Sequence, residues 1–127
     1  MVTDNKLNNI SIADLLRSIS AAYKVKDLPN SRFKIIAYDR AATAIEHLSS
    51  EVKDLWDEGK LEDVGGIGKS IAAHLDEIFR TGKSKHFASL LAGLPPAMFD
   101  LMKVSGIGPK TAQKIASELK ISAKNPF

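Results

Sequence analysis

The chain has 127 residues, of which 44% are hydrophobic and 26% are charged, and it contains no cysteine. This length suffices for one ordinary domain or two very small ones, and the composition is that of a folded protein. The lack of cysteine excludes a disulfide framework, a thiolate metal site and a cysteine nucleophile.

The N-terminal sequence MVTDNKLNNI lacks the basic start and apolar core of a signal peptide. No apolar run approaches the ~20 residues that a membrane span needs. We therefore expect a cytoplasmic protein without a membrane partner.

Charge is unevenly distributed, although the net charge is only +3. Residues 46–63 hold seven acidic residues against two lysines, whereas residues 103–127 hold five lysines against one glutamate. Another basic cluster, RTGKSKH, lies at 80–86. One interpretation is an ordinary solvated surface with chance clustering. The other is a basic face that meets a polyanion, with an acidic face turned away.

Apolar residues recur at helical spacing in the first half of the chain, which predicts helices there. Ser11 and Asp14 resemble a capping box at the start of the first helix, and DLPN at 27–30 separates the first helix from the second. The first helix would bury Ile12, Leu15, Leu16, Ile19, Ala22 and Tyr23, and the second would bury Phe33, Ala37, Ala41, Ala44, Ile45 and Leu48. A short third helix would use Val52, Leu55 and Trp56.

Glycine, serine and proline mark the helix boundaries in the second half of the chain. A helix that follows the glycine turn at 65–68 would end at Thr81-Gly82, and Ser84 can cap the next helix. Pro96 would open a sixth helix through Met102, and Pro109 would open the last one. No segment alternates convincingly with period two, so we predict an all-α fold, a small helical bundle.

One stretch of sequence occurs twice. LEDVGGIGKSIA at 61–72 aligns without a gap with LMKVSGIGPKTA at 101–112, and six of the twelve positions are identical. The shared Gly-Ile-Gly turn lies at 66–68 and again at 106–108. We interpret this as an internal duplication of a helix, a glycine turn and a second helix.

The chemistry of such a turn suits phosphate binding. Amide N–H groups are exposed at the start of the following helix, where the helix dipole adds partial positive charge. Contacts of this kind position nucleic acid without reading its bases. The candidate phosphate contacts are Gly66, Gly68, Lys69, Ser70, Gly106, Gly108, Lys110 and Thr111. The alternative is that each turn only joins two helices.

A mononucleotide P-loop is poorly supported by the same residues. The stretch GIGKS has the Lys-Ser ending of that motif, but the required upstream glycine and the preceding strand are missing. A dinucleotide-binding fingerprint fails for the same lack of strands.

The order of the segments narrows the interpretation further. RFKIIAYDRAATAIEHL at 32–48, VGGIGKSIAAHLDEIFRTGKSKHF at 64–87 and VSGIGPKTAQKI at 104–115 resemble the N-terminal region of family X DNA polymerases. That region contains two helix-hairpin-helix motifs, and the resemblance runs from about Leu15 to Leu119.

The resemblance implies two units and a DNA partner. Residues 1–88 would form a lyase-type helical domain that binds the 5′-phosphate side of a DNA gap, and residues 89–127 a second hairpin subdomain that binds the primer side. The expected partner is gapped, nicked or 5′-phosphorylated DNA, and the protein would be a monomer, associated with the nucleoid if prokaryotic. No cofactor is required by this interpretation.

The resemblance also implies that each hairpin can hold a Na⁺ or K⁺ ion through backbone carbonyl groups. Hard carbonyl oxygens suit such ions, and no side-chain cluster in the sequence suggests a transition metal. By resemblance, the carbonyls belong to Glu62, Val64 and Ile67 in the first turn and to Met102, Val104 and Ile107 in the second.

The 5′-phosphate pocket of the family is matched in part. Lys34 and Tyr38 lie at i and i+4 and correspond to a lysine and a tyrosine of that pocket. Simple core packing is the alternative for Tyr38, and Lys34 could be merely solvated. Two other pocket lysines of the family fall on Ser70 and His86, and Lys69 is the neighbouring residue that could replace them.

The largest departure from the family is His74. In polymerase beta, a lysine at this position forms a Schiff base with the sugar aldehyde of a 5′-deoxyribose phosphate, and imidazole cannot form that imine. His74 could still contact phosphate or carry a proton, or it could be a polar residue without a catalytic task. We therefore predict no catalytic residue, with Lys69 as a weak substitute amine.

Three hypotheses remain open from the sequence. The first is a DNA-binding module without sequence preference, the N-terminal part of a repair polymerase or a stand-alone relative of one. The second is a lyase acting on 5′-deoxyribose phosphate or abasic sites through a lysine elsewhere than position 74. The third is a protein-docking domain, which the lysines at both hairpin helix starts argue against.

Overall fold

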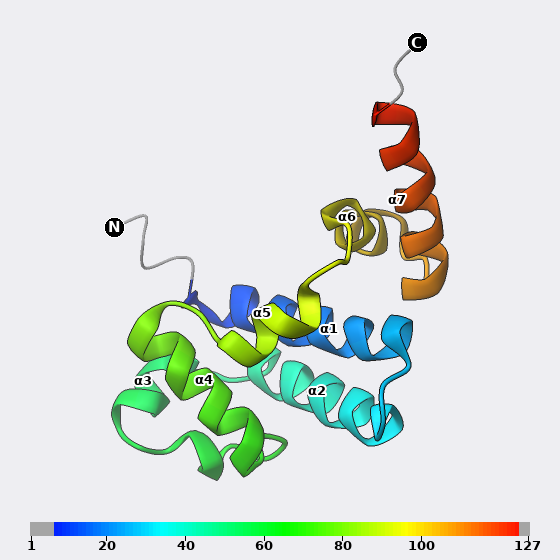
Figure 1. The fold of residues 1–127 in the computed structure, drawn as a ribbon. Coiled ribbons are helices and arrows are strands. Elements are labelled where there is room, and N and C mark those ends of the chain that lie inside the picture. Colours follow the sequence, from blue (N-terminus) through cyan, green and yellow to red (C-terminus); the bar gives the residue numbers. More distant parts are fainter. Residues whose placement is uncertain (1–6, 125–127) are drawn as a thin grey trace.

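The computed structural model describes residues 7–124, and every regular element within that range is helical (Figure 1). The predicted all-α fold is therefore confirmed. The elements in chain order are α1 (Asn9–Lys26), α2 (Ser31–Glu46), α3 (Val52–Asp57), the 3₁₀ helix η2 (Leu61–Asp63), α4 (Lys69–Thr81), α5 (Lys85–Leu91), α6 (Pro96–Ser105) and α7 (Pro109–Lys124).

The antiparallel pair α1 and α2 forms the centre of the fold (Figure 1). The tight turn between them holds Asp27 and Asn30 in the left-handed region, at φ 50° and 62°, which these two residue types tolerate better than most. Arg17 joins the helices by donating two hydrogen bonds, of 2.8 and 3.2 Å, to the Glu46 carboxylate. The predicted breaker at 27–30 thus directs the chain back along α1.

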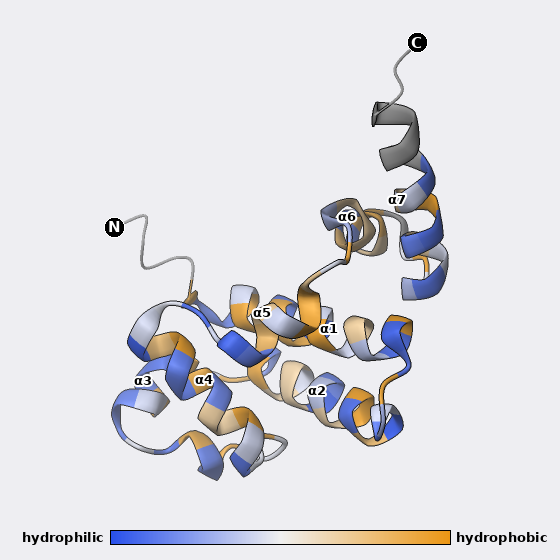
Figure 2. Ribbon diagram, in the orientation of Figure 1, coloured by the Kyte–Doolittle hydropathy of each residue, from blue (hydrophilic) through white to orange (hydrophobic). Residues whose placement is uncertain are grey.

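The main core lies where α1, α2, α4 and α5 meet, and Figure 2 shows hydrophobic positions gathered there. Side chains from all four helices are almost fully buried, including Ile12, Leu16, Ile19, Tyr38, Ile45, Leu75 and Phe87. Burial of such side chains stabilises a fold by about 1.5–3 kcal/mol each.

Two predicted details of the first helices are wrong. The N-cap of α1 is Asn8, whose side chain accepts the N–H of Ser11 at 2.8 Å, so the helix starts earlier than the capping box at Ser11 indicated. Phe33 is 75% exposed instead of buried. Five residues correspond to about 140° around a helix, so the rotation that buries Tyr38 against α1 turns Phe33 toward solvent.

The predicted boundaries in the second half are largely correct. Helix α4 ends at Thr81 with Gly82 at φ 91°, and the Ser84 hydroxyl caps α5 by accepting the N–H of Phe87 at 3.2 Å. Pro96 and Pro109 open α6 and α7, but α6 continues to Ser105, beyond the predicted end at Met102.

A second, smaller cluster joins α6 and α7 to the rest of the chain. Ala112 and Ala116 of α7 and Met98 of α6 are buried against Ala21 of α1. Alanine at three of these positions lets the helices approach closely. The domain boundary after residue 88 stays a prediction.

Within residues 7–124, no single helix is both long and apolar enough to cross a bilayer. One pair of helical segments, Lys85–Leu91 and Pro96–Val104, passes the same test of length and composition together but is bent by 84°.

Candidate nucleic-acid interface

The first glycine turn is built by Gly66, which the fold requires. Its φ of 101° is unfavourable for any residue with a Cβ atom. A Cβ at this position would also lie 3.2 Å from the Ala44 Cβ and 3.3 Å from the Arg40 carbonyl oxygen on α2. The turn is closed by the Ile67 N–H, which donates to the Val64 carbonyl at 3.0 Å.

The start of α4 is open on its outer side. Gly68 is the N-cap at φ −87°, and no side chain caps this end of the helix. The first amide that is bonded into the helix is that of Ala72, which donates to the Gly68 carbonyl at 2.9 Å. The amides of Lys69 and Ser70, whose side chains are exposed, therefore face outward from the helix start.

The second glycine turn repeats this geometry. Gly106 has a φ of 68° and caps α6 by donating to the Met102 carbonyl at 3.1 Å. The Ala112 N–H donates to the Gly108 carbonyl at 2.9 Å, as its counterpart does in the first motif. Lys110 and Thr111 are exposed at the start of α7. The duplicated sequence therefore folds into a duplicated helix start.

Gly68 and Gly108 differ in backbone conformation from Gly66 and Gly106, which lie two residues earlier in each turn. Neither has a positive φ, and a Cβ atom built at either position would meet nothing within 4 Å. Neither backbone strain nor crowding requires glycine at these two positions. Their common property is that they leave the space outside a helix start empty.

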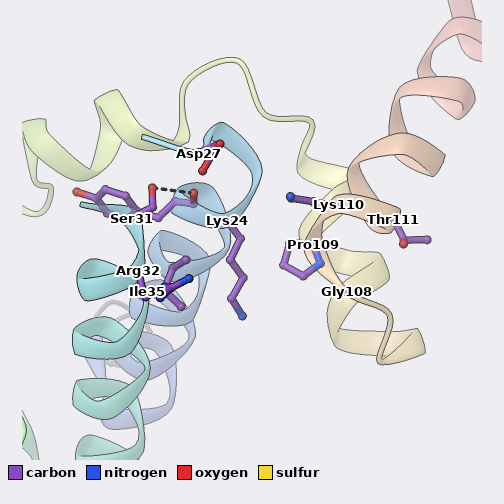
Figure 3. Close-up of a pocket in the computed structure, with 10 residues that line it drawn as sticks. Lys24, Asp27, Ser31, Arg32, Ile35, Gly108, Pro109, Lys110 and Thr111 are labelled. Atoms are coloured by element: carbon purple, nitrogen blue, oxygen red, sulfur yellow. Dashed lines mark hydrogen bonds between the residues drawn. The ribbon is translucent and has the colours of Figure 1, made fainter. Parts of the chain in front are cut away.

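A cleft of about 490 Å³ separates the α1–α2 corner from the start of α7. Figure 3 shows Lys24 and Arg32 on one wall and Lys110 reaching across from the other. Asp27 is the single carboxylate among the residues that line it. Lys24 is held loosely by Asp39, at 4.0 Å. The cleft therefore carries an excess of positive charge.

A cluster of aromatic rings lies where α2, α4 and α5 meet. The Tyr38 ring contacts Tyr23 at 5.9 Å and Phe87 at 5.7 Å between centroids. The His74 ring packs on Phe87 at 5.2 Å and stacks on His86 at 4.4 Å, with 12° between the two imidazole planes. Four residues at or next to the predicted 5′-phosphate pocket are thus joined by ring contacts.

Burial and nearby charges shift the pKa of two groups in this cluster. Burial lowers the pKa of the His74 imidazole; His86 and Lys34 act in the same direction, whereas Glu77 opposes them. Burial also raises the pKa of the Tyr38 phenol, which therefore stays protonated. Lys34 is close enough to affect His74 electrostatically, as the predicted pocket requires.

The Tyr38 side chain is 1% exposed, as core packing would have it, but its hydroxyl group has no hydrogen-bond partner among residues 7–124. The hydroxyl therefore keeps a free donor. Both interpretations of Tyr38 from the sequence are compatible with this placement.

Lys69 does not lie on the face of α4 that carries His74. It lines a separate hollow with Glu62 and Asp76, and five residues correspond to about 140° around the helix. Ser70 precedes His74 by one turn and is exposed.

Two features of this surface were not predicted from the sequence. Lys24 and Arg32 lie at opposite ends of the tight turn at 27–30, and that turn was the signal for their proximity. The sequence places His86 in the predicted 5′-phosphate pocket but does not predict its stack on His74, since the break at Gly82 indicates only a turn between α4 and α5.

The carbonyl groups expected to hold cations lie at both turns. Those of Val64 and Met102 already accept one N–H each, which leaves one lone pair on each oxygen. Val64 is half-buried, whereas Val104 is 86% exposed. No group of three or more His, Asp or Glu side chains suited to a metal ion occurs within the described range.

Comparison with known proteins identifies the fold family. The model of a family described as a helix-hairpin-helix domain matches residues 7–84, more than half of the chain. This chain belongs to the helix-hairpin-helix domain family. A further model, described as a helix-hairpin-helix motif, matches residues 89–118. Both hairpins predicted from the sequence repeat are therefore confirmed.

A curated relative tests the predicted resemblance of this helix-hairpin-helix protein to family X DNA polymerases. DNA polymerase/3′-5′ exonuclease PolX of Bacillus subtilis (strain 168) is 30% identical over 108 residues. The aligned part covers 85% of this chain but only 18% of PolX. The resemblance to the helix-hairpin-helix region of a family X DNA polymerase is confirmed, and the chain spans less than a fifth of that relative's length.

Proposed function

We propose that the chain binds DNA through phosphate contacts of its two helix-hairpin-helix motifs, without reading the base sequence. One observation carries the proposal. Gly68 and Gly108 lie at corresponding helix starts, and the fold requires glycine at neither position. Open helix starts with free amides are suited to phosphate oxygens. The similarity to PolX supports DNA as the source of the phosphates.

The preferred form of DNA is a gap with a 5′-phosphate. The support is the group formed by Lys34, the free Tyr38 hydroxyl and the two stacked imidazoles. A terminal phosphate needs several donors and cations because it carries up to two negative charges. Phe33, which is 75% exposed one residue before Lys34, offers an apolar ring on which an unpaired base of the gap can stack.

The strand held at the second hairpin passes along the cleft between α7 and the α1–α2 corner. Lys24, Arg32 and Lys110 face that cleft with Asp27 as their only acidic neighbour among the lining residues. Three converging cations repel each other, and a sugar-phosphate backbone between them would relieve the repulsion.

Each hairpin is proposed to hold one Na⁺ or K⁺ ion when DNA is bound. The turn carbonyls fit because they are hard, neutral oxygens with lone pairs to spare. Such an ion would supply positive charge for a phosphate, and the helix-start amides would donate hydrogen bonds to its oxygens.

DNA affinity is expected to fall steeply with salt. If the chain neutralises about four phosphates, the slope of log affinity against log salt concentration is about −3 to −4. Fluorescence anisotropy with a labelled gapped duplex at several salt concentrations measures this slope. Affinity that does not depend on salt, or that differs strongly between unrelated sequences, contradicts backbone binding.

Removing the 5′-phosphate from a gapped duplex is expected to weaken binding by about tenfold, since one charge-assisted phosphate contact is worth about 1.5–3 kcal/mol. Lys34→Ala should remove most of this difference, because Lys34 supplies the permanent cation near His74. Lys53→Ala, on α3 in the acidic segment, is the matched control and should preserve the difference. A wild-type protein that binds both duplexes equally would show that this pocket does not recognise the phosphate.

A further inference from the structure

The stacked histidines carry an inference that rests on the proposed binding of a 5′-phosphate. We propose that His74 and His86 are the residues that select a terminal phosphate, and that they take up a proton when it binds. The ligand class is a phosphate monoester at a DNA end. A phosphodiester within the strand carries one negative charge, whereas the terminal monoester carries up to two.

The geometry of the pair disfavours charge in the free protein. The imidazole centroids are 4.4 Å apart and the planes are nearly parallel, so two imidazolium ions would face each other. Phe87, only 2% exposed, packs on the inner side of His74 and excludes water from it. Stacking and burial therefore disfavour a positive charge on His74 in the free protein.

The groups that face His74 come from three helices. Lys34 lies near it on α2, Glu77 lies on α4 itself, and His86 faces it from α5, while Tyr38 of α2 packs on the Phe87 ring that His74 also contacts. Lys34 and His86 disfavour its protonation, and Glu77 favours it. The Glu77 carboxylate also accepts the Lys85 N–H at 3.2 Å, at the start of α5. Glu77 is therefore the single carboxylate among these groups. The site lacks a further anion that would stabilise a second positive charge on the two imidazoles.

A terminal phosphate dianion supplies that anion. Beside it, imidazolium is favoured over imidazole, so the pKa of His74 is lower in the free protein than in the complex. A group whose pKa rises on binding takes up protons, and affinity then increases as pH falls through the interval between the two pKa values. Below about pH 6 the free phosphate itself gains a proton, and the increase levels off.

The test compares one gapped duplex with a 5′-phosphate and the same duplex with a 5′-hydroxyl group, at constant salt. The ratio of the two affinities should rise about fivefold between about pH 8 and about pH 6.5 for the wild type. In the double variant His74→Gln/His86→Gln, the ratio should stay at its high-pH value, because glutamine keeps hydrogen bonding but cannot gain charge. Circular dichroism at both pH values confirms that each variant is folded.

The third histidine of the chain provides a matched control. His47 is exposed at the end of α2, where its Nδ1 lies 2.8 Å from the Thr43 carbonyl oxygen. His47→Gln should retain the wild-type pH response. Calorimetry in two buffers of different ionisation enthalpy should detect proton uptake with the phosphorylated duplex and not with the hydroxyl duplex.

The outcomes separate this inference from the proposed function. A wild-type ratio that exceeds one but does not change with pH overturns the inference and leaves phosphate recognition intact. A ratio of one at both pH values removes the 5′-phosphate pocket and the inference together. A pH response that survives in the double variant shows that another group takes up the proton, and it overturns the role of the histidines.

Discussion

Gly68→Ser is expected to leave the protein folded and to weaken DNA binding by about tenfold, the equivalent of one lost charge-assisted hydrogen bond. The structure provides room for this side chain, because a Cβ at position 68 meets nothing within 4 Å and φ is −87°. Serine is a favourable N-cap, so its hydroxyl would accept one of the free amides at the start of α4. The substitution therefore gives a helix-start amide a hydrogen-bond partner and, at the same time, takes that amide away from the phosphate.

Gly66→Ala is the companion variant, and it is expected to lower the stability of the fold, which Gly68→Ser should preserve. Alanine at φ 101°, in contact with Ala44 and the Arg40 backbone, should lower the free energy of unfolding by about 1–3 kcal/mol. Chemical denaturation measures the stability of both variants, and anisotropy measures their DNA affinity. Gly108→Ser should repeat the Gly68→Ser result, because its surroundings are equally open.

Comparison of the Gly68→Ser and Gly108→Ser variants with Gly66→Ala decides whether the hairpins bind phosphate. A folded Gly68→Ser protein with wild-type affinity would show that the open helix start has no part in DNA binding. A large loss of stability in the same variant would show that the fold needs this glycine after all. Lys53→Ala serves as the control for a change of charge on a helix outside both hairpins.

Local sequence signals predicted the helical architecture well because each boundary has a local physical cause. Gly82, Ser84 and the prolines that open α6 and α7 act on backbone conformation within a few residues, so their effect can be predicted from the sequence alone. The duplicated turn was visible for the same reason, because a left-handed glycine and an open helix start require particular residues at fixed positions.

Rotation of helices and contacts between them were less predictable. The period of apolar residues placed Phe33 on the buried face of α2, but Tyr38, Ala41 and Ile45 determine which side of the helix meets α1. The stack of His74 on His86 depends on where α5 lies after the chain turns at Gly82, and no local pattern encodes the packing of α5 on α1. Candidate site residues within one motif could therefore be found from the residues themselves, whereas residues on separate helices were brought together only by the resemblance to a known family.

His74→Lys is expected to turn the pocket into one that forms a Schiff base. An amine at this position can condense with the aldehyde of a 5′-deoxyribose phosphate end, and borohydride then reduces the imine to a stable link. Burial against Phe87 and the nearby Lys34 lower the pKa of His74, and the same surroundings would lower the pKa of a lysine ammonium. A larger fraction of the amine would then be unprotonated and nucleophilic.

Trapping by the His74→Lys variant should exceed the wild-type level by about tenfold, because the wild type has no amine at this position. His47→Lys adds the same amine at an exposed site on α2 and should stay at the wild-type level. No increase for His74→Lys would mean that the sugar does not reach α4 when DNA is bound. Efficient trapping by the wild type that survives His74→Ala would reveal another lysine as the nucleophile, and a lyase would then replace the binding module as the function of this chain.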